Sequence, residues 1–370
     1  MRKKSYKVLF VIGTRPDAIK LAPVIREFRG KFLSRVVATT QHRELLKEVI
    51  KVFRLQVHVD FNLMKENQDL FYLTSGILSR MRETLEEIKP DIIFVQGDTT
   101  TSFIASLAAF YFKIPVAHVE AGLRTHDPYA PYPEEMNRVF VDHLSSLCFA
   151  PTPQAKENLL KDGIPEERIH VVGNTGIDAM FWVLENVPPG EEVKELVKGD
   201  KKIVLLTVHR RENFGEPLRE IFRAVREIAE ERRDVLFVYP VHPNPNVKRP
   251  AEEMLGNVEN ILLLTPLSYP DLLYVLKHSS LVLTDSGGIQ EEAPYFGVRV
   301  GVLREKTERP EGVKAGYVRV LGSDRERIKE WFFELIEKPS LPPSSLYGDG
   351  KASERIRRIT EVFLESFIPS

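Results

Sequence analysis

Short runs of aliphatic and β-branched residues alternate along the whole chain with stretches whose apolar residues recur at helical spacing. We predict β-strands at residues 7–12, 35–39, 91–95, 115–119, 169–172, 202–208, 235–238, 261–264, 281–284 and 299–303. These strands are almost continuously apolar, which is typical of parallel sheets covered by helices on both faces. The pattern therefore predicts an α/β protein with doubly wound parallel sheets.

The alternation is interrupted between residues 188 and 200 by Pro-Pro-Gly and a charged stretch. At 370 residues, the chain is also too long for one ordinary core. We therefore predict two Rossmann-like domains, with the active site in the cleft between them. The first comprises residues 1–175 with a C-terminal helix at 352–370, and the second comprises residues 176–351. The helix is expected because Ile356, Ile359 and Phe363 recur at helical spacing.

Composition excludes several classes of protein. Hydrophobic residues make up 43% and charged residues 28%, which is typical of a globular chain. The net charge of −1 provides no general positive field, so we expect neither nucleic acid nor a membrane as a partner. No apolar run approaches the roughly 20 residues of a membrane span, and we expect a cytoplasmic location. Cys148, the only cysteine, lies in an apolar run and is interpreted as a buried small hydrophobe.

Ligands of open parallel sheets bind beyond the carboxyl ends of the strands, so residues that follow strands are the first candidates. The first strand leads into a turn in which Gly13 permits a tight bend and Pro16 suits a helix start. Arg15 and Lys20 place two cations at that helix start, against the helix dipole, which favours an anion-binding role. Neither the P-loop nor the dinucleotide-binding glycine pattern occurs, so no nucleotide cofactor is predicted.

Three acidic residues of the first half follow strands or a loop, namely Asp98, Glu120 and Glu134. Asp98 could be no more than a helix cap, and the same holds for Glu134 or its neighbour Glu135. A cluster of three at neighbouring strand or loop ends is nevertheless typical of general acid–base chemistry. Strand alternation also predicts that His118 and Glu120 share one face. The single cysteine excludes a deaminase-type zinc site, and no other spacing supports a metal.

The second half shows polar residues at equivalent places. His209, Arg210 and Arg211 directly follow a strand, and this combination suits a diphosphate. His242 ends another strand, where a structural and a binding role are equally open. The strand at 281–284 runs into Asp285, followed by Ser-Gly-Gly, which predicts a turn and helix start that bind phosphate.

Two further groups belong to the same prediction. Glu291 and Glu292 lie one turn into that helix, where a carboxylate can accept two ribose hydroxyls. Arg309 follows the next strand within Thr-Glu-Arg-Pro. Together with the glycine turn, these residues predict a nucleoside diphosphate site.

Seven blocks of sequence, in order, resemble the non-hydrolysing UDP-N-acetylglucosamine (UDP-GlcNAc) 2-epimerases, which have the glycosyltransferase-B fold. The blocks are residues 13–16 (Gly-Thr-Arg-Pro), 96–100 (Gln-Gly-Asp-Thr-Thr), 119–124 (Val-Glu-Ala-Gly-Leu-Arg), 133–138 (Pro-Glu-Glu-Met-Asn-Arg), 209–213 (His-Arg-Arg-Glu-Asn), 285–292 (Asp-Ser-Gly-Gly-Ile-Gln-Glu-Glu) and 307–310 (Thr-Glu-Arg-Pro). The resemblance covers nearly the whole chain.

The resemblance implies inversion at C2 of the sugar, giving UDP-N-acetylmannosamine (UDP-ManNAc) for polysaccharide synthesis. It implies elimination of UDP to 2-acetamidoglucal and re-addition, without a cofactor or a metal, in a homodimer. The implied catalytic residues are Asp98, Glu120, Glu134, His209, Arg15 and Lys20, and the choice between base and acid among the carboxylates is open. The implied UDP-binding residues are Arg210, His242, Ser286, Gly287, Gly288, Glu292 and Arg309.

Bacterial members of that family have a second, activating UDP-GlcNAc site with two glutamines and an arginine. Here Gln41 matches, but Glu44 stands in place of the second glutamine and Asn67 in place of the arginine. An added carboxylate and a lost cation oppose the binding of a sugar diphosphate. We therefore expect weak or absent allosteric activation.

Three other interpretations remain open. A hydrolysing 2-epimerase would release free N-acetylmannosamine. The first loop of that class of enzyme lacks the Arg-Pro-x-x-x-Lys pattern that Arg15, Pro16 and Lys20 form here. A glycosyltransferase of the same fold would not require three carboxylates. A non-enzymatic sensor of sugar nucleotides would need the binding residues but not Asp98 or Glu134.

Overall fold

The computed structural model describes residues 5–39, 43–63 and 68–366. The chain divides into two compact units, Met1–Trp182 with Tyr347–Ser370 (unit 1) and Val183–Leu346 (unit 2). The boundary predicted at residue 175 falls at the first residue of helix α7 (Thr175–Asn186), and the change of unit occurs within that helix.

Unit 1 is built on a parallel sheet with the order β3-β2-β1-β4-β5-β6-β7 among the described residues. Its strands are β1 (Lys7–Ile12), β2 (Leu33–Ala38), β3 (Val59–Asp60), β4 (Ile92–Gln96), β5 (Val116–Val119), β6 (Leu147–Ala150) and β7 (Ile169–Val171). Besides α7, its helices are α1 (Arg15–Phe28), α2 (Arg43–Phe53), α3 (Leu70–Ile88), α4 (Thr100–Tyr111), α5 (Glu134–Leu144), α6 (Pro153–Lys161), the 3₁₀ turn η1 (Glu166–Arg168) and α15 (Ala352–Ser366).

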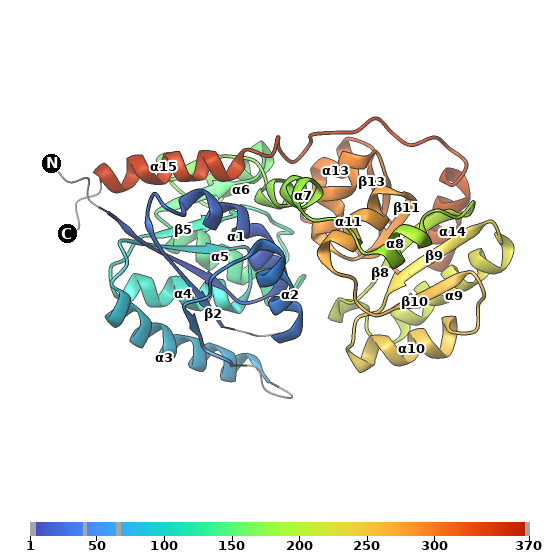
Figure 1. Ribbon diagram of the computed structural model, residues 1–370, viewed down its shortest axis with the longest axis horizontal. Helices are drawn as coiled ribbons and strands as arrows, with labels where there is room; N and C mark the ends of the chain where they lie inside the picture. The colour runs from blue at the N-terminus through green and yellow to red at the C-terminus, as the bar shows by residue number, and fades with distance from the viewer. Residues whose placement is uncertain (1–4, 40–42, 64–67, 367–370) are drawn as a thin grey trace. The chain divides into compact units, whose positions relative to one another are not determined.

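Helices cover both faces of this sheet, as its continuously apolar strands require. On one face, α3, α4 and α5 pack over inward side chains such as Leu9. On the other, Phe28 of α1 makes edge contacts with Phe10 at 5.5 Å and with Phe94 at 5.2 Å between ring centroids. The last helix, α15, packs against α1, and Figure 1 shows the pair on the side of the sheet opposite α3.

Unit 2 is built on a second parallel sheet with the order β10-β9-β8-β11-β12-β13 among the described residues. Its strands are β8 (Lys202–Thr207), β9 (Val235–Pro240), β10 (Ile261–Leu264), β11 (Ser279–Thr284), β12 (Arg299–Val302) and β13 (Val318–Val320). Its helices and 3₁₀ turns are α8 (Glu191–Leu196), η2 (Arg211–Asn213), α9 (Glu216–Glu231), α10 (Pro245–Leu255), α11 (Tyr269–Lys277), α12 (Gly287–Glu292), η3 (Ala293–Phe296), α13 (Pro310–Lys314) and α14 (Arg325–Leu335).

The predicted fold class, two doubly wound parallel sheets, is confirmed. All ten predicted strands are present, but β3, β6 and β13 were missed. These strands have two to four residues, too few to show a periodic pattern. The run that contains Cys148 was interpreted only as a site of burial, whereas it is strand β6; the thiol is indeed buried, and burial raises its pKa. Among the described residues, no helix is long and apolar enough to cross a bilayer.

Candidate active site

The order of the strands reverses between β1 and β4 in unit 1 and between β8 and β11 in unit 2. The connections that leave such neighbouring strands diverge to opposite faces, which leaves room for a ligand at the carboxyl edge. The candidate residues of unit 1 follow β1, β4 and β5, and those of unit 2 follow β8, β9, β11 and β12. Each unit thus gathers its candidate residues at one edge of its own sheet.

The turn after β1 is held by a carboxylate that the sequence analysis overlooked. Asp17 accepts hydrogen bonds from the backbone N–H groups of Gly13 and Thr14, both at 3.1 Å, and from the Thr14 hydroxyl at 2.8 Å. Burial raises the pKa of Asp17 to about 6 despite these bonds. A side chain at position 13 would collide with Thr101, since an added Cβ would lie 2.3 Å from its hydroxyl oxygen.

The two cations of this turn have different surroundings. Lys20 is buried on α1, and its ammonium group donates to a carboxylate oxygen of Glu120. Arg15, at the start of α1, is 18% exposed at its side chain and lies 3.5 Å from the carboxylate of Glu48 on α2. Of the two cations expected to bind an anion, Lys20 is therefore buried and bonded to Glu120, and Arg15 lies nearer the surface.

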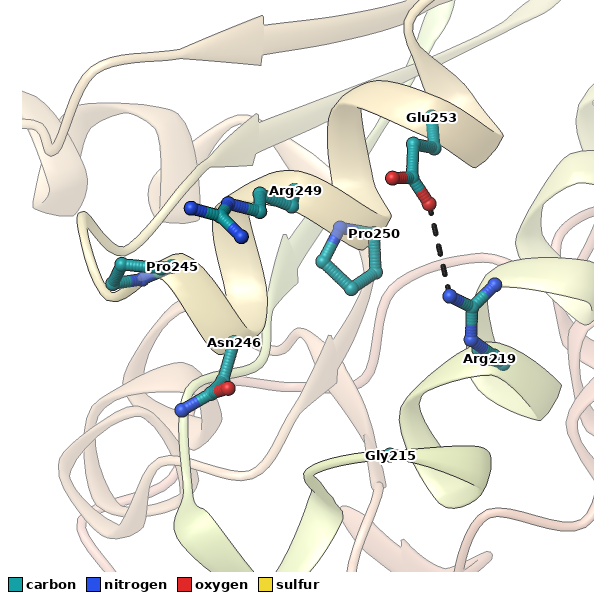
Figure 2. Close-up of a pocket in the computed structure, with 7 residues that line it drawn as sticks. All are labelled: Gly215, Arg219, Pro245, Asn246, Arg249, Pro250 and Glu253. Carbon is teal, nitrogen blue, oxygen red and sulfur yellow. Dashed lines mark ion pairs between the residues drawn. The ribbon is translucent and has the colours of Figure 1, made fainter.

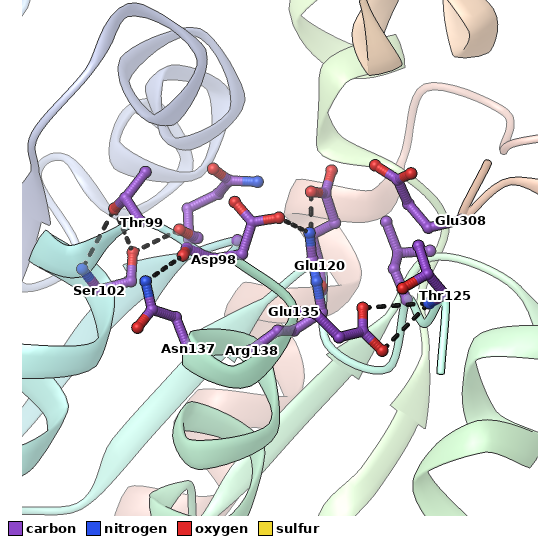
Figure 3. A network of polar contacts seen from close by, with 12 residues as sticks. Asp98, Thr99, Ser102, Glu120, Thr125, Glu135, Asn137, Arg138 and Glu308 are labelled. Atoms are coloured by element: carbon purple, nitrogen blue, oxygen red, sulfur yellow. Dashed lines mark hydrogen bonds and ion pairs between the residues drawn. The ribbon is translucent and has the colours of Figure 1, made fainter. Parts of the chain in front are cut away.

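Asp98 and Glu120 meet at a single arginine, Arg138 of α5 (Figure 3). Arg138 donates from Nη2 to Asp98, and from Nη1 to the backbone carbonyl of Glu120 at 2.7 Å, with the Glu120 carboxylate 3.5 Å away. Glu120 is thus flanked by two cations, Lys20 and Arg138. Helix α4 is capped by Thr99, which accepts from the N–H of Ser102 at 3.2 Å, so Asp98 does not cap it.

The direction of Glu120 does not come from strand alternation, as we had expected. Strand β5 ends at Val119, and Glu120 has a backbone φ of 69°, a left-handed conformation that is rare for a residue with a side chain. Such a conformation persists only where surrounding bonds enforce it. Arg138 and Lys20 provide those bonds here.

Glu134 and Glu135 both begin α5 but differ in surroundings. Glu135 is buried and accepts from the backbone N–H groups of Thr125 and His126, so it fixes the preceding loop (Figure 3). Glu134 is only partly buried and lies four residues before Arg138, on the same helix face. Glu135 thus holds the loop, and Glu134 is the more exposed carboxylate of the pair.

In unit 2, a buried aspartate organises the loop after β8. One oxygen of Asp285 accepts from the N–H of His209 at 2.9 Å, the N–H of Arg210 at 2.8 Å and the side-chain amide of Asn213 at 3.0 Å. Its other oxygen lies 3.3 Å from Nδ1 of His209. The His209 ring stacks on His242 with 5.7 Å between centroids, so both predicted histidines lie together.

The glycine turn after β11 leads into α12, a helix of only six residues. The two glycines have different surroundings: an added Cβ on Gly287 would lie 2.5 Å from the guanidinium carbon of Arg309, whereas Gly288 faces open space. Ser286 is partly exposed beside them. Gly288 and Ser286 are therefore the positions of this turn that a phosphate group can approach.

Arg309 belongs to a buried network rather than to an exposed surface. Its guanidinium group donates to Glu291 at 2.6 Å and to Glu308 at 2.5 Å, and Glu308 also accepts from Arg304 at 2.8 Å. Burial alone would raise the pKa of Glu308, but Arg309, Arg304 and Arg210 hold it well below its usual value. Glu291 is thus occupied by Arg309, and only Glu292 is left for ribose.

Glu292 accepts a hydrogen bond from the hydroxyl of Tyr269 at 2.6 Å. The tyrosine lies at the start of α11 and was not singled out in the sequence. It fixes one carboxylate oxygen and thereby the orientation of the other.

A surface hollow of unit 2 lies between the first turn of α9, which follows Gly215, and helix α10, and Arg219 of α9 forms an ion pair at 3.7 Å with Glu253 near the end of α10 (Figure 2). No residue predicted to bind UDP lines it. Within the described chain, no group of three His, Cys, Asp or Glu residues could hold a metal ion. Gln41 and Asn67 and the side chain of Glu44 lie outside the described residues, so weakened allosteric activation stays a prediction.

Comparison with known proteins shows which family has this sequence and fold. The model of the family described as UDP-N-acetylglucosamine 2-epimerase matches residues 26–361. The chain belongs to this family. The UDP-N-acetylglucosamine 2-epimerase of Escherichia coli K12 is 44% identical over 364 residues, which cover 95% of this chain and 97% of that protein.

Solved structures support both the family and the fold. The UDP-GlcNAc 2-epimerase of Neisseria meningitidis, bound to UDP-GlcNAc, matches with a TM-score of 0.91 and 44% identity over 97% of this chain and 100% of that one. The glycotransferase of kitacinnamycin is only 14% identical, but it matches with a TM-score of 0.61 over 97% of this chain and 96% of its own. The last match shows the fold alone, and the glycosyltransferase-B architecture of this epimerase family member is confirmed.

Proposed function

We propose that this protein interconverts UDP-GlcNAc and UDP-ManNAc by eliminating UDP and adding it back. Its family membership and the UDP-GlcNAc bound to the Neisseria relative support the substrate. The observation that carries the mechanism is the sharing of Arg138 by Asp98 and Glu120, with Lys20 on Glu120. A protein that only bound a sugar nucleotide would not need two carboxylates held around one arginine.

In the forward reaction, a carboxylate removes the C2 proton, the C1–O bond breaks, and its electron pair leaves with UDP. The product is 2-acetamidoglucal with a double bond between C1 and C2. A second carboxyl group then protonates C2 from the opposite face while the UDP oxygen returns to C1. Inversion requires proton donors and acceptors on both sides of the sugar, which is consistent with Asp98, Glu120 and Glu134 as the acid–base groups.

The leaving diphosphate carries the negative charge that develops during elimination. Preorganised cations and N–H groups stabilise such charge most effectively. In our proposal Arg15, Lys20 and His209 contact the diphosphate and the sugar. Ser286, Gly288 and Glu292 bind UDP at the partly open turn of unit 2, and Gly287 and Arg309 support that turn from behind.

Incubation with UDP-GlcNAc in D2O tests the proposal directly. We expect deuterium at C2 of both UDP-GlcNAc and UDP-ManNAc by NMR, without an acceptor and without added cofactor. Accumulation of free N-acetylmannosamine would indicate the hydrolysing epimerase, and the absence of C2 exchange would exclude the mechanism.

We further propose that the enzyme is a cytoplasmic homodimer. Large aromatic side chains are exposed at the end of α4, with Phe110 58% and Tyr111 64% exposed and 6.4 Å between their ring centroids. Contiguous exposed apolar side chains of this kind commonly mark an interface. Light scattering measures the mass in solution, and a monomer would contradict this part of the proposal.

A further inference from the structure

His118 is a buried histidine of strand β5 whose two ring nitrogens both have close partners. Nδ1 lies 2.6 Å from a carboxylate oxygen of Asp142 on α5, and Nε2 lies 2.7 Å from the backbone carbonyl of Gly97. The exposed fraction of both His118 and Asp142 is 0%. No water can therefore replace either partner.

These contacts determine how many protons the ring carries. A carbonyl oxygen only accepts, so Nε2 must donate to Gly97. The Asp142 carboxylate accepts from Arg124 at 2.5 Å and from the N–H of Gly122 at 3.3 Å, so it is also an acceptor toward Nδ1. A neutral imidazole has one N–H group and would satisfy only one of the two. Burial would raise the pKa of Asp142, but His118 and Arg124 hold it below its usual value.

The bond to Gly97 links the His118 ring to the turn that carries Asp98. Gly97 immediately precedes Asp98 and has a left-handed φ of 67°. Its N–H donates to the carbonyl of Val119 at 2.9 Å, so the turn is tied to β5 at both its N–H and its carbonyl. Glu120 follows His118 by two residues, and the same strand end therefore fixes both carboxylates.

We propose that His118 is an imidazolium that acts as a positioning residue, holding the Gly97 carbonyl and hence the turn that carries Asp98. Its role in the reaction rests on the function proposed above. The carboxylate of Asp142 on α5 carries the opposite charge, and Arg124 forms a second ion pair with the same carboxylate. The other titratable group beside the ring is the thiol of Cys148, which pairs with His118 across β5 and β6.

The protonation state can be measured without any activity. In protein labelled with ¹⁵N-histidine, the resonances of His118 are assigned by their loss in His118→Gln. We expect two ring N–H groups, one bonded to the Gly97 carbonyl and one to Asp142. A single ring N–H group would overturn the proposal.

The positioning role is tested by two neutral replacements of the same ring. The amide of His118→Gln can reach the place of Nε2 and keep a bond to Gly97, whereas that of His118→Asn reaches only the place of Nδ1 and Asp142. We expect kcat to fall about 100-fold in His118→Asn and clearly less in His118→Gln, because small displacements of a reacting group have effects of this size. The KM for UDP-GlcNAc and the affinity for UDP should change little in either variant.

The control is His143→Gln, an exposed position on α5 next to Asp142, which should retain wild-type kcat and thermal stability. Equal kcat in the Asn and Gln variants, at equal melting temperature, would contradict the positioning role. Lack of C2 exchange in the wild-type protein would contradict the proposed function instead, and the NMR result would still decide whether His118 is charged.

Discussion

At the carboxyl edge of the first sheet, Asp98 and Glu120 share Arg138, and the side chain of Asp98 remains 24% exposed. At the same edge of the second sheet, Asp285 and Glu291 are fully buried and occupied by internal donors. The two units have the same kind of sheet and similar residue types at the strand ends. Asp98 retains access to a ligand whereas Asp285 and Glu291 do not, and that access separates a proton-transfer group from a structural one.

The same substitution, Asp→Asn, tests this difference at three positions, and the largest effect is expected at Asp98. Removing an acid–base group typically lowers the rate by 10² to 10⁴, so we expect kcat to fall about 10³-fold in Asp98→Asn. Thermal stability should change little, because the amide oxygen still accepts from Arg138. The D2O exchange assay measures the loss, and Glu157→Gln, an exposed position on α6, is the control with unchanged rate.

Asp285→Asn should mainly lower stability. One oxygen of Asp285 accepts three hydrogen bonds in a fully buried place, and bonds to a charged acceptor contribute about 1.5 to 3 kcal/mol each. We expect a loss of about 3 kcal/mol in the free energy of unfolding, with weaker UDP binding as a consequence. Urea unfolding measures this loss. A variant with wild-type stability but no turnover would place Asp285 with the catalytic carboxylates.

Asp17→Asn should raise stability at neutral pH. The pKa of Asp17 is about 6 in the folded protein, above its ordinary 3.8, so the folded state binds this proton more tightly than the unfolded state. The associated stability is complete below about pH 4 and is lost as pH rises to about 6. The amide resembles the protonated acid, and we expect a gain of about 1 to 3 kcal/mol above pH 6, because the amide does not carry the buried charge that the carboxylate acquires there.

Thermal unfolding of wild type and Asp17→Asn at about pH 4 and about pH 7 gives the comparison. The two proteins should differ only at the higher pH. An equal difference at both values would show that the carboxyl group of Asp17 does not titrate in this range.

The positions of the candidate residues along the chain were predictable because strand ends can be recognised in the sequence. Apolar runs predicted ten strands, and the polar residues after them included Asp98, Glu120, His209 and Ser286. The rule that ligands bind at these ends needs no coordinates. The partners could not be predicted, because each comes from a distant part of the chain: Lys20 pairs with Glu120 across 100 positions, and Arg138 joins Asp98 across 40.

By itself, the sequence determined the α/β class, the order of ten of the strands, and the kinds of side chain at the ends of those strands. Burial on both sheet faces demands continuous apolar runs, so the residues that bind or react must lie after the strands. Only the tertiary structure decided which carboxylates remain accessible and which are saturated. That outcome depends on the donors that packing brings within about 3 Å of each carboxylate, such as Arg309 beside Glu291 and Asn213 beside Asp285, and no local pattern records those distances.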